Sequence, residues 1–309
     1  MHEIIKQLTT EINKVIVGKE AAVTKLLVCV LAGGHALLDD VPGVGKTTLA
    51  MAVAKAMGLS YKRIQFTPDV LPSDITGFSI YNKETGSLKY MPGVVSSANI
   101  LLGDEINRTS SKTQSALLEA MEEKQVTVDG VTHALLSPFI VIATQNNVGT
   151  AGTQLLPFAQ LDRFLMRLSL GYPDLESQMA IIRDRQKCNP IENVKQSISV
   201  ADVIKMQEEV QDVTVKDSVI RYIAHIAESS RNSEDIDLGI SPRGALFVAR
   251  ASKAHAYLQG RNYVIPNDVR EIFTDVCTHR VILSPKGLKM SGPTVMENLL
   301  NSVTPPDAS

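Results

Sequence analysis

The ten residues 39–48, DDVPGVGKTT, decide how the first half of the chain folds. They match the phosphate-binding pattern G-x-x-x-x-G-K-[ST] except at its first position, where Asp40 replaces glycine. The apolar run HALLD precedes them, and TLAMAVAKAMG after them is typical of a helix that ends at Gly58. A strand, a glycine-rich loop and a helix in this order predict phosphate binding at the helix N-terminus. The alternative is a plain glycine-rich turn between a strand and a helix.

Asp40 lies outside the part of the loop that would hold an anion, because the backbone N–H groups for that task come from residues 43–47. Glycine at positions 43 and 45 permits positive φ angles and a close approach of the backbone. Lys46 supplies positive charge for the β and γ phosphates, and the hydroxyl of Thr47 suits Mg²⁺. We expect the Asp40 carboxylate to turn away from the phosphates or to accept hydrogen bonds from backbone N–H groups.

Apolar runs typical of strands alternate with helical stretches up to Tyr172, which predicts an α/β domain with a parallel sheet. The candidate strands are HALLD, YKRIQF, NILLGD, FIVIAT and FLMRLSL. From Pro173 onward we expect helices only, because apolar residues recur there at helical spacing. Two such stripes are Val219, Ile220, Ile223, Ile226 and Ala227, and Val269, Ile272, Phe273, Val276 and Cys277. The predicted divisions are a nucleotide-binding core over 1–172, a helical domain over 173–292 and a disordered tail over 293–309.

Two hairpins are predicted within the first domain. Val126, Val128 and Val131 alternate around Asp129-Gly130, the pair favoured in a two-residue type I′ turn. The second hairpin has Ser79–Tyr81 and Leu88–Tyr90 as its arms, around the polar loop 82–86. Neither adds to the central sheet in this interpretation, and from the residues alone both could be surface decoration.

Polar residues follow two of the apolar strands. Asp104 would hold Mg²⁺ through its water shell, and Glu105 would polarise the attacking water. Asn146, after the strand FIVIAT, either reaches the γ-phosphate or the water, or only caps the strand. A hydrophobic run that ends in Asp-Glu is common and alone indicates little. Here it follows a phosphate loop by one further strand, which makes it a strong indication of a hydrolytic site.

Two arginines follow later in the chain. Arg163 precedes the last strand, where its guanidinium could project to the nucleotide of a neighbouring subunit. Ser241 and Pro242 are typical of an N-cap and a first helical turn, which predicts Arg243 at a helix start, facing back toward the phosphates. Either arginine could instead be an ordinary ion-pair partner.

Composition limits the classes of partner. With 31 Lys and Arg residues against 33 Asp and Glu, the formal net charge is −2, so no global field draws nucleic acid or membrane. The N-terminus lacks the uninterrupted apolar core of a signal peptide, and LLVCVLAGGHALL is too short for membrane insertion. Cys29, Cys188 and Cys277 have no metal-binding spacing, and free thiols in a reducing cytoplasm account for them. We expect no metal besides Mg²⁺.

In chain order, the segments VPGVGKTT, NILLGDEINRTSSKTQSALLEAMEEKQVTVDG, FIVIATQNN, LPFAQLDRFLMRLSLGYP and SPRG resemble the MoxR family of AAA+ ATPases. The resemblance covers roughly residues 16–281, and the DEINR and LDRF blocks are specific to it. Members of the family commonly carry Asp or Gly at the place of Asp40, so this departure does not imply a dead site. Asn147 stands where the family usually has proline, which puts only local loop geometry in doubt.

The resemblance implies an AAA+ core with a parallel five-stranded sheet of order 5-1-4-3-2, an α-helical lid, and a ring, usually hexameric, with ATP between subunits. The site residues that it implies are Val17 and Gly18 at the adenine pocket, Gly43, Val44, Gly45, Lys46, Thr47 and Thr48 in the phosphate loop, Asp104 and Glu105 as the Walker B pair, Asn146 as sensor 1, Arg163 as arginine finger and Arg243 as sensor 2. Thr47 and Asp104 would hold Mg²⁺.

Families of this kind act as chaperone-like remodelers of protein clients, often with partners that carry von Willebrand factor A domains. The two hairpins correspond to the helix-2 insert and the pre-sensor-1 hairpin, which would face the pore or one face of the ring. The serious alternative is a nucleic-acid translocase similar to the MCM helicases, but the hairpin tips NKETG and DG are near neutral or acidic. A GTPase would need an N-K-x-D motif, a helical lid with Arg243 argues against a small-molecule kinase, and intact Glu105 and Arg163 argue against a non-catalytic scaffold. The sequence does not identify the client.

Overall fold

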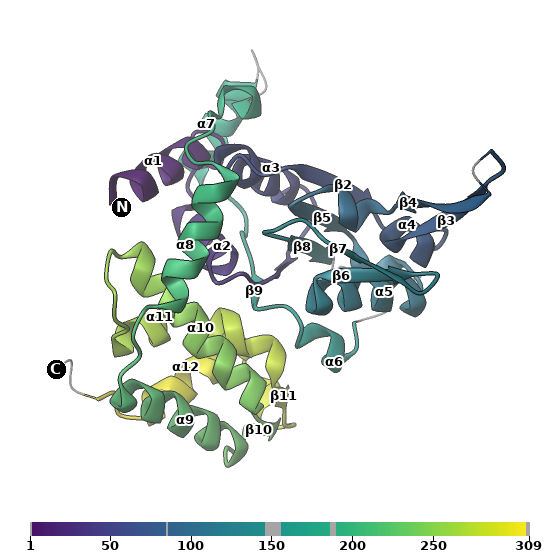
Figure 1. Ribbon diagram of the computed structural model, residues 1–309. Coiled ribbons are helices and arrows are strands. Elements are labelled where there is room, and N and C mark those ends of the chain that lie inside the picture. Colours follow the sequence, from purple (N-terminus) through teal and green to yellow (C-terminus); the bar gives the residue numbers. More distant parts are fainter. Residues whose placement is uncertain (1, 85, 146–155, 186–189, 307–309) are drawn as a thin grey trace.

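The computed structural model describes residues 2–84, 86–145, 156–185 and 190–306 (Figure 1). The α-helices are α1 His2–Asn13, α2 Glu20–Leu31, α3 Lys46–Ala56, α4 Pro72–Thr76, α5 Ser111–Glu123, α6 Phe158–Leu161, α7 Leu175–Arg185, α8 Val200–Gln211, α9 Asp217–Arg231, α10 Pro242–Leu258, α11 Pro266–Cys277 and α12 Gly292–Ser302. The strands are β1 Ala36–Asp39, β2 Tyr61–Gln65, β3 Gly77–Asn82, β4 Ser87–Pro92, β5 Ile100–Asp104, β6 Gln125–Val128, β7 Val131–Ala134, β8 Ile140–Gln145, β9 Met166–Leu168, β10 Ile236–Leu238 and β11 Ile282–Leu283. Short 3₁₀ helices are η1 Val94–Ser97, η2 Ile106–Arg108, η3 Pro190–Asn193, η4 Thr278–Arg280 and η5 Gly287–Lys289.

The central sheet has five parallel strands in the order β2-β5-β8-β1-β9. Counted along the chain, these are strands 2-3-4-1-5, so the predicted order 5-1-4-3-2 is confirmed. The register places Asp39 beside Gln145 and Gln65 beside Asp104. The carboxyl ends of four strands therefore meet at one edge of the sheet, where ligands bind in folds of this type.

Both faces of the sheet are covered, because successive side chains along a strand point to opposite faces. In β1, Leu38 packs into the larger hydrophobic core, which α1, α2, α3 and the helical domain share, and Leu37 packs into a second core with α5. In β5, Leu102 and Leu101 divide in the same way. This double covering explains why β5 and β8 are buried along their whole length.

Helices α8 to α12 form the second domain; in Figure 1, α9 to α12 lie below the sheet and α8 lies beside α2. Ser241 caps α10, since its Oγ accepts a hydrogen bond from the N–H of Gly244 at 3.1 Å, and Pro242 is in the first turn, as predicted. Both predicted apolar stripes lie on helices, α9 and α11, and are buried except for Ile220, which is 50% exposed. An α-helix has 3.6 residues per turn. At this spacing Ile220 lies at the edge of the buried stripe of α9, so its side chain is partly exposed.

Two expectations for this domain are wrong. Strands do continue past Pro173, because β10 and β11 pair in a small antiparallel sheet. The tail over 293–309 was expected to be disordered, yet α12 covers Gly292–Ser302. The Oγ of Ser291 caps this helix, and Val295, Met296, Leu299 and Leu300 are buried at helical spacing. The composition of the last residues, TPPDAS, hid this preceding amphipathic segment.

The two hairpins form as predicted, apart from the central sheet. Asp129 and Gly130 have φ angles of 50° and 78°, as a type I′ turn requires. The β3–β4 hairpin projects away from the core, at the right of Figure 1. At its base the ring of Tyr90 stacks on His133 of the other hairpin, with centroids 3.8 Å apart.

Cys29 and Cys277 are buried and free, and burial raises the pKa of each thiol to about 12. Cys188 lies outside the described residues. Among the helices in the described ranges, none has the length and apolar character needed to cross a membrane.

Candidate functional site

The phosphate loop joins β1 to α3 at the carboxyl edge of the sheet. Gly43 and Gly45 have φ angles of 86° and 97°, and α3 begins at Lys46. A Cβ atom built on either glycine would meet nothing within 4 Å, so glycine is required here by φ, and the space over the loop is open. A cavity of about 350 Å³ lies above it, lined by Pro42, Gly43, Gly45, Lys46, Thr47, Thr48, Arg63, Gln65, Asp104, Glu105 and Thr144.

Asp40 is turned away from this cavity, as expected from its position. Its carboxylate accepts hydrogen bonds from Ser169 Oγ at 2.9 Å, from the N–H of Gly171 at 3.2 Å and from the N–H of Leu170. The Nζ of Lys46 donates to the backbone carbonyl of Asp40 at 2.8 Å. Burial lowers the pKa of Lys46, and nearby carboxylates, with Asp40 the largest contributor, oppose that shift.

Asp104 and Glu105 sit side by side at the end of β5, within the same cavity. The hydroxyl of Thr144 on β8 joins them, because it donates to Asp104 Oδ1 at 3.0 Å and accepts from the N–H of Glu105 at 3.0 Å. Glu105 has a φ angle of 56°, a left-handed conformation that is rare for a residue other than glycine and costs about 1–3 kcal/mol. Backbone strain of this kind is concentrated at functional sites, where surrounding contacts maintain it.

Two residues of β2 contact these carboxylates and were missed from the sequence. Arg63 Nε donates to Asp104 Oδ2 at 2.7 Å, and Gln65 Nε2 donates to Glu105 Oε2 at 2.9 Å. Their signal was present, since polar residues two apart on a strand point to the same face. Their importance depended on β2 lying beside β5, which the run YKRIQF alone does not reveal.

The two predicted arginines do not enter this cavity. Arg163 and Arg243 meet instead at Glu122 in the last turn of α5, at 2.7 Å and 2.8 Å from its two carboxylate oxygens. The sequence predicts that Arg243 faces back toward the phosphates, whereas within one chain the structure places it on Glu122, outside the phosphate cavity. The N-cap at Ser241 is as predicted, but the position of the lid on the core directs the start of α10 toward α5.

The remaining predicted residues lie elsewhere. Val17 and Gly18 occupy the turn between α1 and α2, where a Cβ atom on Gly18 would come within 2.1 Å of Ser177 Oγ, so this turn packs against α7. Asn146 falls outside the described residues, and so does Asn147. The preceding residue, Gln145, donates from Nε2 to Asp39 Oδ2 at 3.3 Å.

The cavity fits a nucleotide phosphate chain and its magnesium ion. Backbone N–H groups at the start of α3, the open space over Gly43 and Gly45, and the cation of Lys46 suit phosphate. The Thr47 hydroxyl and the Asp104 carboxylate, which also line the cavity, are hard oxygen groups of the kind that Mg²⁺ prefers.

Comparison with known families agrees with this geometry. The family described as ATPase family associated with various cellular activities (AAA) matches residues 35–166, and the AAA lid domain matches residues 228–299. With the strand order and the phosphate cavity, these matches define the protein as a nucleotide-binding AAA+ ATPase with a helical lid.

Individual relatives narrow the assignment. The chain is 48% identical to YeaC from Bacillus subtilis over 286 residues, 93% of this chain and 89% of that protein. It is 38% identical to chaperone MoxR1 from Mycobacterium tuberculosis, over 97% of this chain and 81% of the relative. A crystal structure of an ATPase from Cytophaga hutchinsonii superposes with a TM-score of 0.91 at 38% identity, covering 99% and 96% of the two chains. The chain belongs to the MoxR family of AAA+ ATPases.

Proposed function

We propose that the protein assembles into a homo-oligomeric ring, a hexamer as the family resemblance implies, and hydrolyses ATP between subunits to remodel, mature or activate a protein client. One observation carries this proposal. The phosphate loop and the paired carboxylates share one cavity, whereas Arg163 and Arg243 lie together in another, on Glu122. A single chain thus carries two separate parts of an arginine-assisted ATPase site, and a second copy would complete it.

Within one subunit, Lys46 and the N–H groups of the loop bind the phosphates. Thr47 and Asp104 would hold Mg²⁺, which would neutralise phosphate charge. Thr48, Val44 and the two loop glycines complete the cradle. Glu105 accepts the proton of the attacking water, and Gln65 holds its carboxylate in place at 2.9 Å. Asn146 senses the γ-phosphate, and Val17 and Gly18 contact adenine; these three roles come from the family resemblance.

The β3–β4 hairpin supports a protein as the client. Phe78, Ile80, Tyr81, Leu88 and Met91 on its two strands are each more than a third exposed. Exposed apolar clusters of this kind are typical of protein interaction sites. We propose that this hairpin contacts the client or a partner with a von Willebrand factor A domain.

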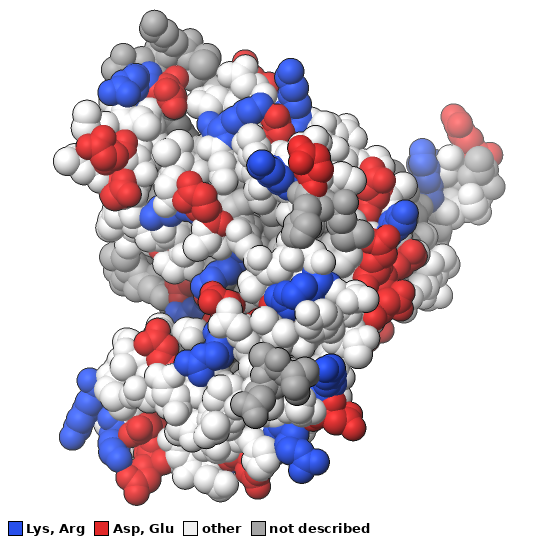
Figure 2. Space-filling model, turned by 90° about the vertical axis from the view of Figure 1, so that its left-hand side faces the viewer, with Lys and Arg blue, Asp and Glu red and all other residues white. Residues whose placement is uncertain are grey.

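A nucleic-acid translocase is the second candidate, and the charges argue against it. The tip of the β3–β4 hairpin carries both Lys83 and Glu84, and Asp129 is at the tip of the other hairpin. In Figure 2, Lys and Arg side chains are scattered among Asp and Glu side chains, so among the described residues drawn no continuous basic track crosses this face. A translocase would show ATPase stimulation by single-stranded DNA that falls steeply as salt rises.

Subunit mixing tests the proposal. Arg163→Ala should lower turnover by about 10³- to 10⁵-fold, as for other arginine fingers, and Lys46→Ala should remove it. When the two variants are mixed, some interfaces pair an intact loop with an intact arginine, so activity should return. The control mixes Lys46→Ala with the Lys46→Ala/Arg163→Ala double variant, in which no interface is complete. If mixed rings form and activity does not return at any ratio, Arg163 does not act across subunits.

A further inference from the structure

One cavity contains both Arg163 and Arg243, called here the arginine pair. Lys124 and Arg250 also line it, so it has four cationic side chains. It measures about 160 Å³ and lies where the lid meets the core. Its lining residues are Gly33, Gly34, His35, Met121, Glu122, Lys124, Arg163, Leu165, Arg243, Phe247 and Arg250. Glu122 is the single carboxylate in this lining, so the cavity carries an excess of positive charge. Pockets for whole ligands have volumes of about 300 Å³ or more, so this one suits an anionic group rather than an entire nucleotide.

Glu122 contacts the two arginines as an external anion would. Its Oε2 is 2.7 Å from Arg163 Nη1, and its Oε1 is 2.8 Å from Arg243 Nη2. Arg163 also donates to the carbonyl of Leu118 at 3.0 Å, and the Arg243 guanidinium lies 5.7 Å from the centre of the Phe247 ring. Each guanidinium is therefore held by a second contact while one of its nitrogens contacts the shared carboxylate.

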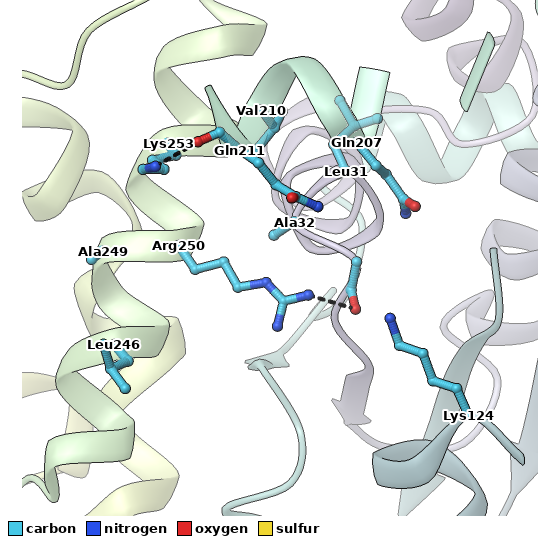
Figure 3. Close-up of a pocket in the computed structure, with 11 residues that line it drawn as sticks. Leu31, Ala32, Lys124, Gln207, Val210, Gln211, Leu246, Ala249, Arg250 and Lys253 are labelled. Atoms are coloured by element: carbon cyan, nitrogen blue, oxygen red, sulfur yellow. Dashed lines mark hydrogen bonds between the residues drawn. The ribbon is translucent and has the colours of Figure 1, made fainter. Parts of the chain in front are cut away.

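Lys124 and Arg250 add positive charge that no carboxylate balances. Among the described residues, neither forms an ion pair, and the Arg250 side chain donates to the carbonyl of Gly33 at 3.1 Å. Figure 3 shows the side chains of Arg250, from α10, and Lys124, from the end of α5, extending toward each other. These two residues and Gly33 also line the adjoining cavity drawn there.

We propose that Glu122 occupies, in the separate subunit, the place that the phosphate of a neighbour's nucleotide takes under the proposed function, and that Lys124 and Arg250 help to bind that phosphate. This inference rests on the proposed function, and it adds Lys124 and Arg250 to the arginine pair. A phosphate group carries more negative charge than a carboxylate, so the four cations favour the phosphate once it arrives. Glu122 then acts as an internal competitor that sets how much ATP is needed for assembly.

Nucleotide-dependent assembly provides the test, measured by analytical ultracentrifugation with ATP and Mg²⁺ in a Glu105→Gln background, which prevents consumption of ATP. Glu122→Gln removes the competing charge, so half-maximal assembly should need about two- to fivefold less ATP, the range expected for partly exposed ion pairs. The difference should shrink as salt rises. Glu123→Gln is the matched control, because the neighbouring exposed glutamate forms no ion pair among the described residues.

Variants of Lys124 and Arg250 provide a second, independent test, in which the ATP requirement for assembly should change in the opposite direction. Lys124→Asn and Arg250→Gln should each raise the ATP concentration needed for assembly. Asparagine is chosen at position 124 because the φ angle there is 53°, which asparagine tolerates better than most residues. Lys112→Gln on the exposed side of α5 is the control. Thermal unfolding of each variant shows whether it remains folded.

The outcomes separate this inference from the proposed function. If Glu122→Gln needs as much ATP as Glu123→Gln or more, Glu122 only supports the arginines and the inference is overturned. It is also overturned if Lys124→Asn and Arg250→Gln assemble like Lys112→Gln. In either case the mixing of Arg163→Ala with Lys46→Ala still reports on the ring itself. A chain that does not assemble with ATP would overturn both.

Discussion

The Nζ of Lys46 lies 2.8 Å from the backbone carbonyl oxygen of Asp40, while the Asp40 carboxylate points the other way, to residues 169–171 after β9. Asp40 thus contributes two different groups to two different tasks. Its carbonyl, which any residue would supply, holds the lysine at the loop, and its carboxylate ties the loop to the last strand of the sheet. This arrangement explains how an acidic residue is accommodated at the first position of a phosphate-binding pattern.

Asp40→Ala should therefore lower stability more than nucleotide affinity. The change removes a charged acceptor from the N–H groups of Leu170 and Gly171, which should cost about 1–3 kcal/mol of unfolding free energy. The dissociation constant for ATP should change by less than about threefold, which is about 0.7 kcal/mol, because no phosphate contact is lost. Urea unfolding and nucleotide titration measure the two effects, with exposed Asp69→Ala as control. A large loss of affinity at unchanged stability would contradict this division.

Lys46 and Glu105 should separate binding from chemistry. Lys46→Ala removes the cation of the phosphate cradle and should abolish ATP binding. Glu105→Gln keeps the shape and the contact to Gln65 but removes the base, so binding should persist while turnover falls by about two to four orders of magnitude. Nucleotide titration and phosphate-release assays measure the two quantities. The assignment of Glu105 is wrong if both variants fail to bind.

The comparison between sequence and structure shows what local pattern can and cannot give. The phosphate loop, the carboxylates after β5 and both hairpins follow from short-range signals, namely glycine, turn pairs and strand alternation. Arg243 shows the limit. Its N-cap was predictable from Ser241 and Pro242, but its direction depends on how the lid packs against α5. Glu122, Arg63 and Gln65 were missed for the same reason, because their partners come from other elements of the fold.

The shared contact of Arg163 and Arg243 with Glu122 leads to a prediction about which subunit supplies each arginine. If both arginines act on the nucleotide of a neighbour, one subunit must supply both. A mixture of Arg163→Ala and Arg243→Ala subunits should then stay inactive, because every subunit lacks one of the two. Arg243→Ala mixed with Lys46→Ala should regain activity. Recovery in the first mixture, measured by phosphate release, would instead place Arg243 at the phosphates of its own chain.

Acid should destabilise the protein through His35. This buried ring accepts a hydrogen bond from the N–H of Val141 at Nδ1, at 2.9 Å, and its Nε2 lies 3.0 Å from the carbonyl of Met121. Burial, with the charges of Lys124 and Arg250, lowers its pKa from 6.5 to about 4. The unfolded chain thus binds a proton at higher pH than the folded chain, so stability should fall as pH drops from about 6.5 to about 4, by about 3 kcal/mol from this residue.

Urea unfolding at pH 7 and pH 5 measures this effect. His35→Gln should lose less stability between the two pH values than the natural protein does, although it is less stable at pH 7. His225→Gln is the control, because that side chain is 57% exposed. Equal pH dependence in His35→Gln and the natural protein would show that His35 does not carry the effect.

The exposed apolar face of the β3–β4 hairpin should be needed for the client and not for ATP hydrolysis. Phe78 and Ile80 are 49% and 48% exposed and lie two residues apart, so they share a face of the hairpin. Met91 pairs with Phe78 across the strands, which places it on the same face. None of these three residues lines the phosphate cavity.

The double variant Phe78→Ser/Ile80→Ser should therefore keep its basal ATPase rate within about twofold, a change of less than 0.5 kcal/mol, as for surface substitutions far from a site. Stimulation by a co-purifying protein partner should be lost, because serine removes the apolar area that the partner would bury. The control is Leu288→Ser, a change at a 70% exposed leucine in the lid. The measurement is ATPase rate with and without the partner, repeated with single-stranded DNA at several salt concentrations. An unchanged response to the partner would exclude this face as the client contact, and stimulation by DNA that collapses with salt would favour a translocase instead.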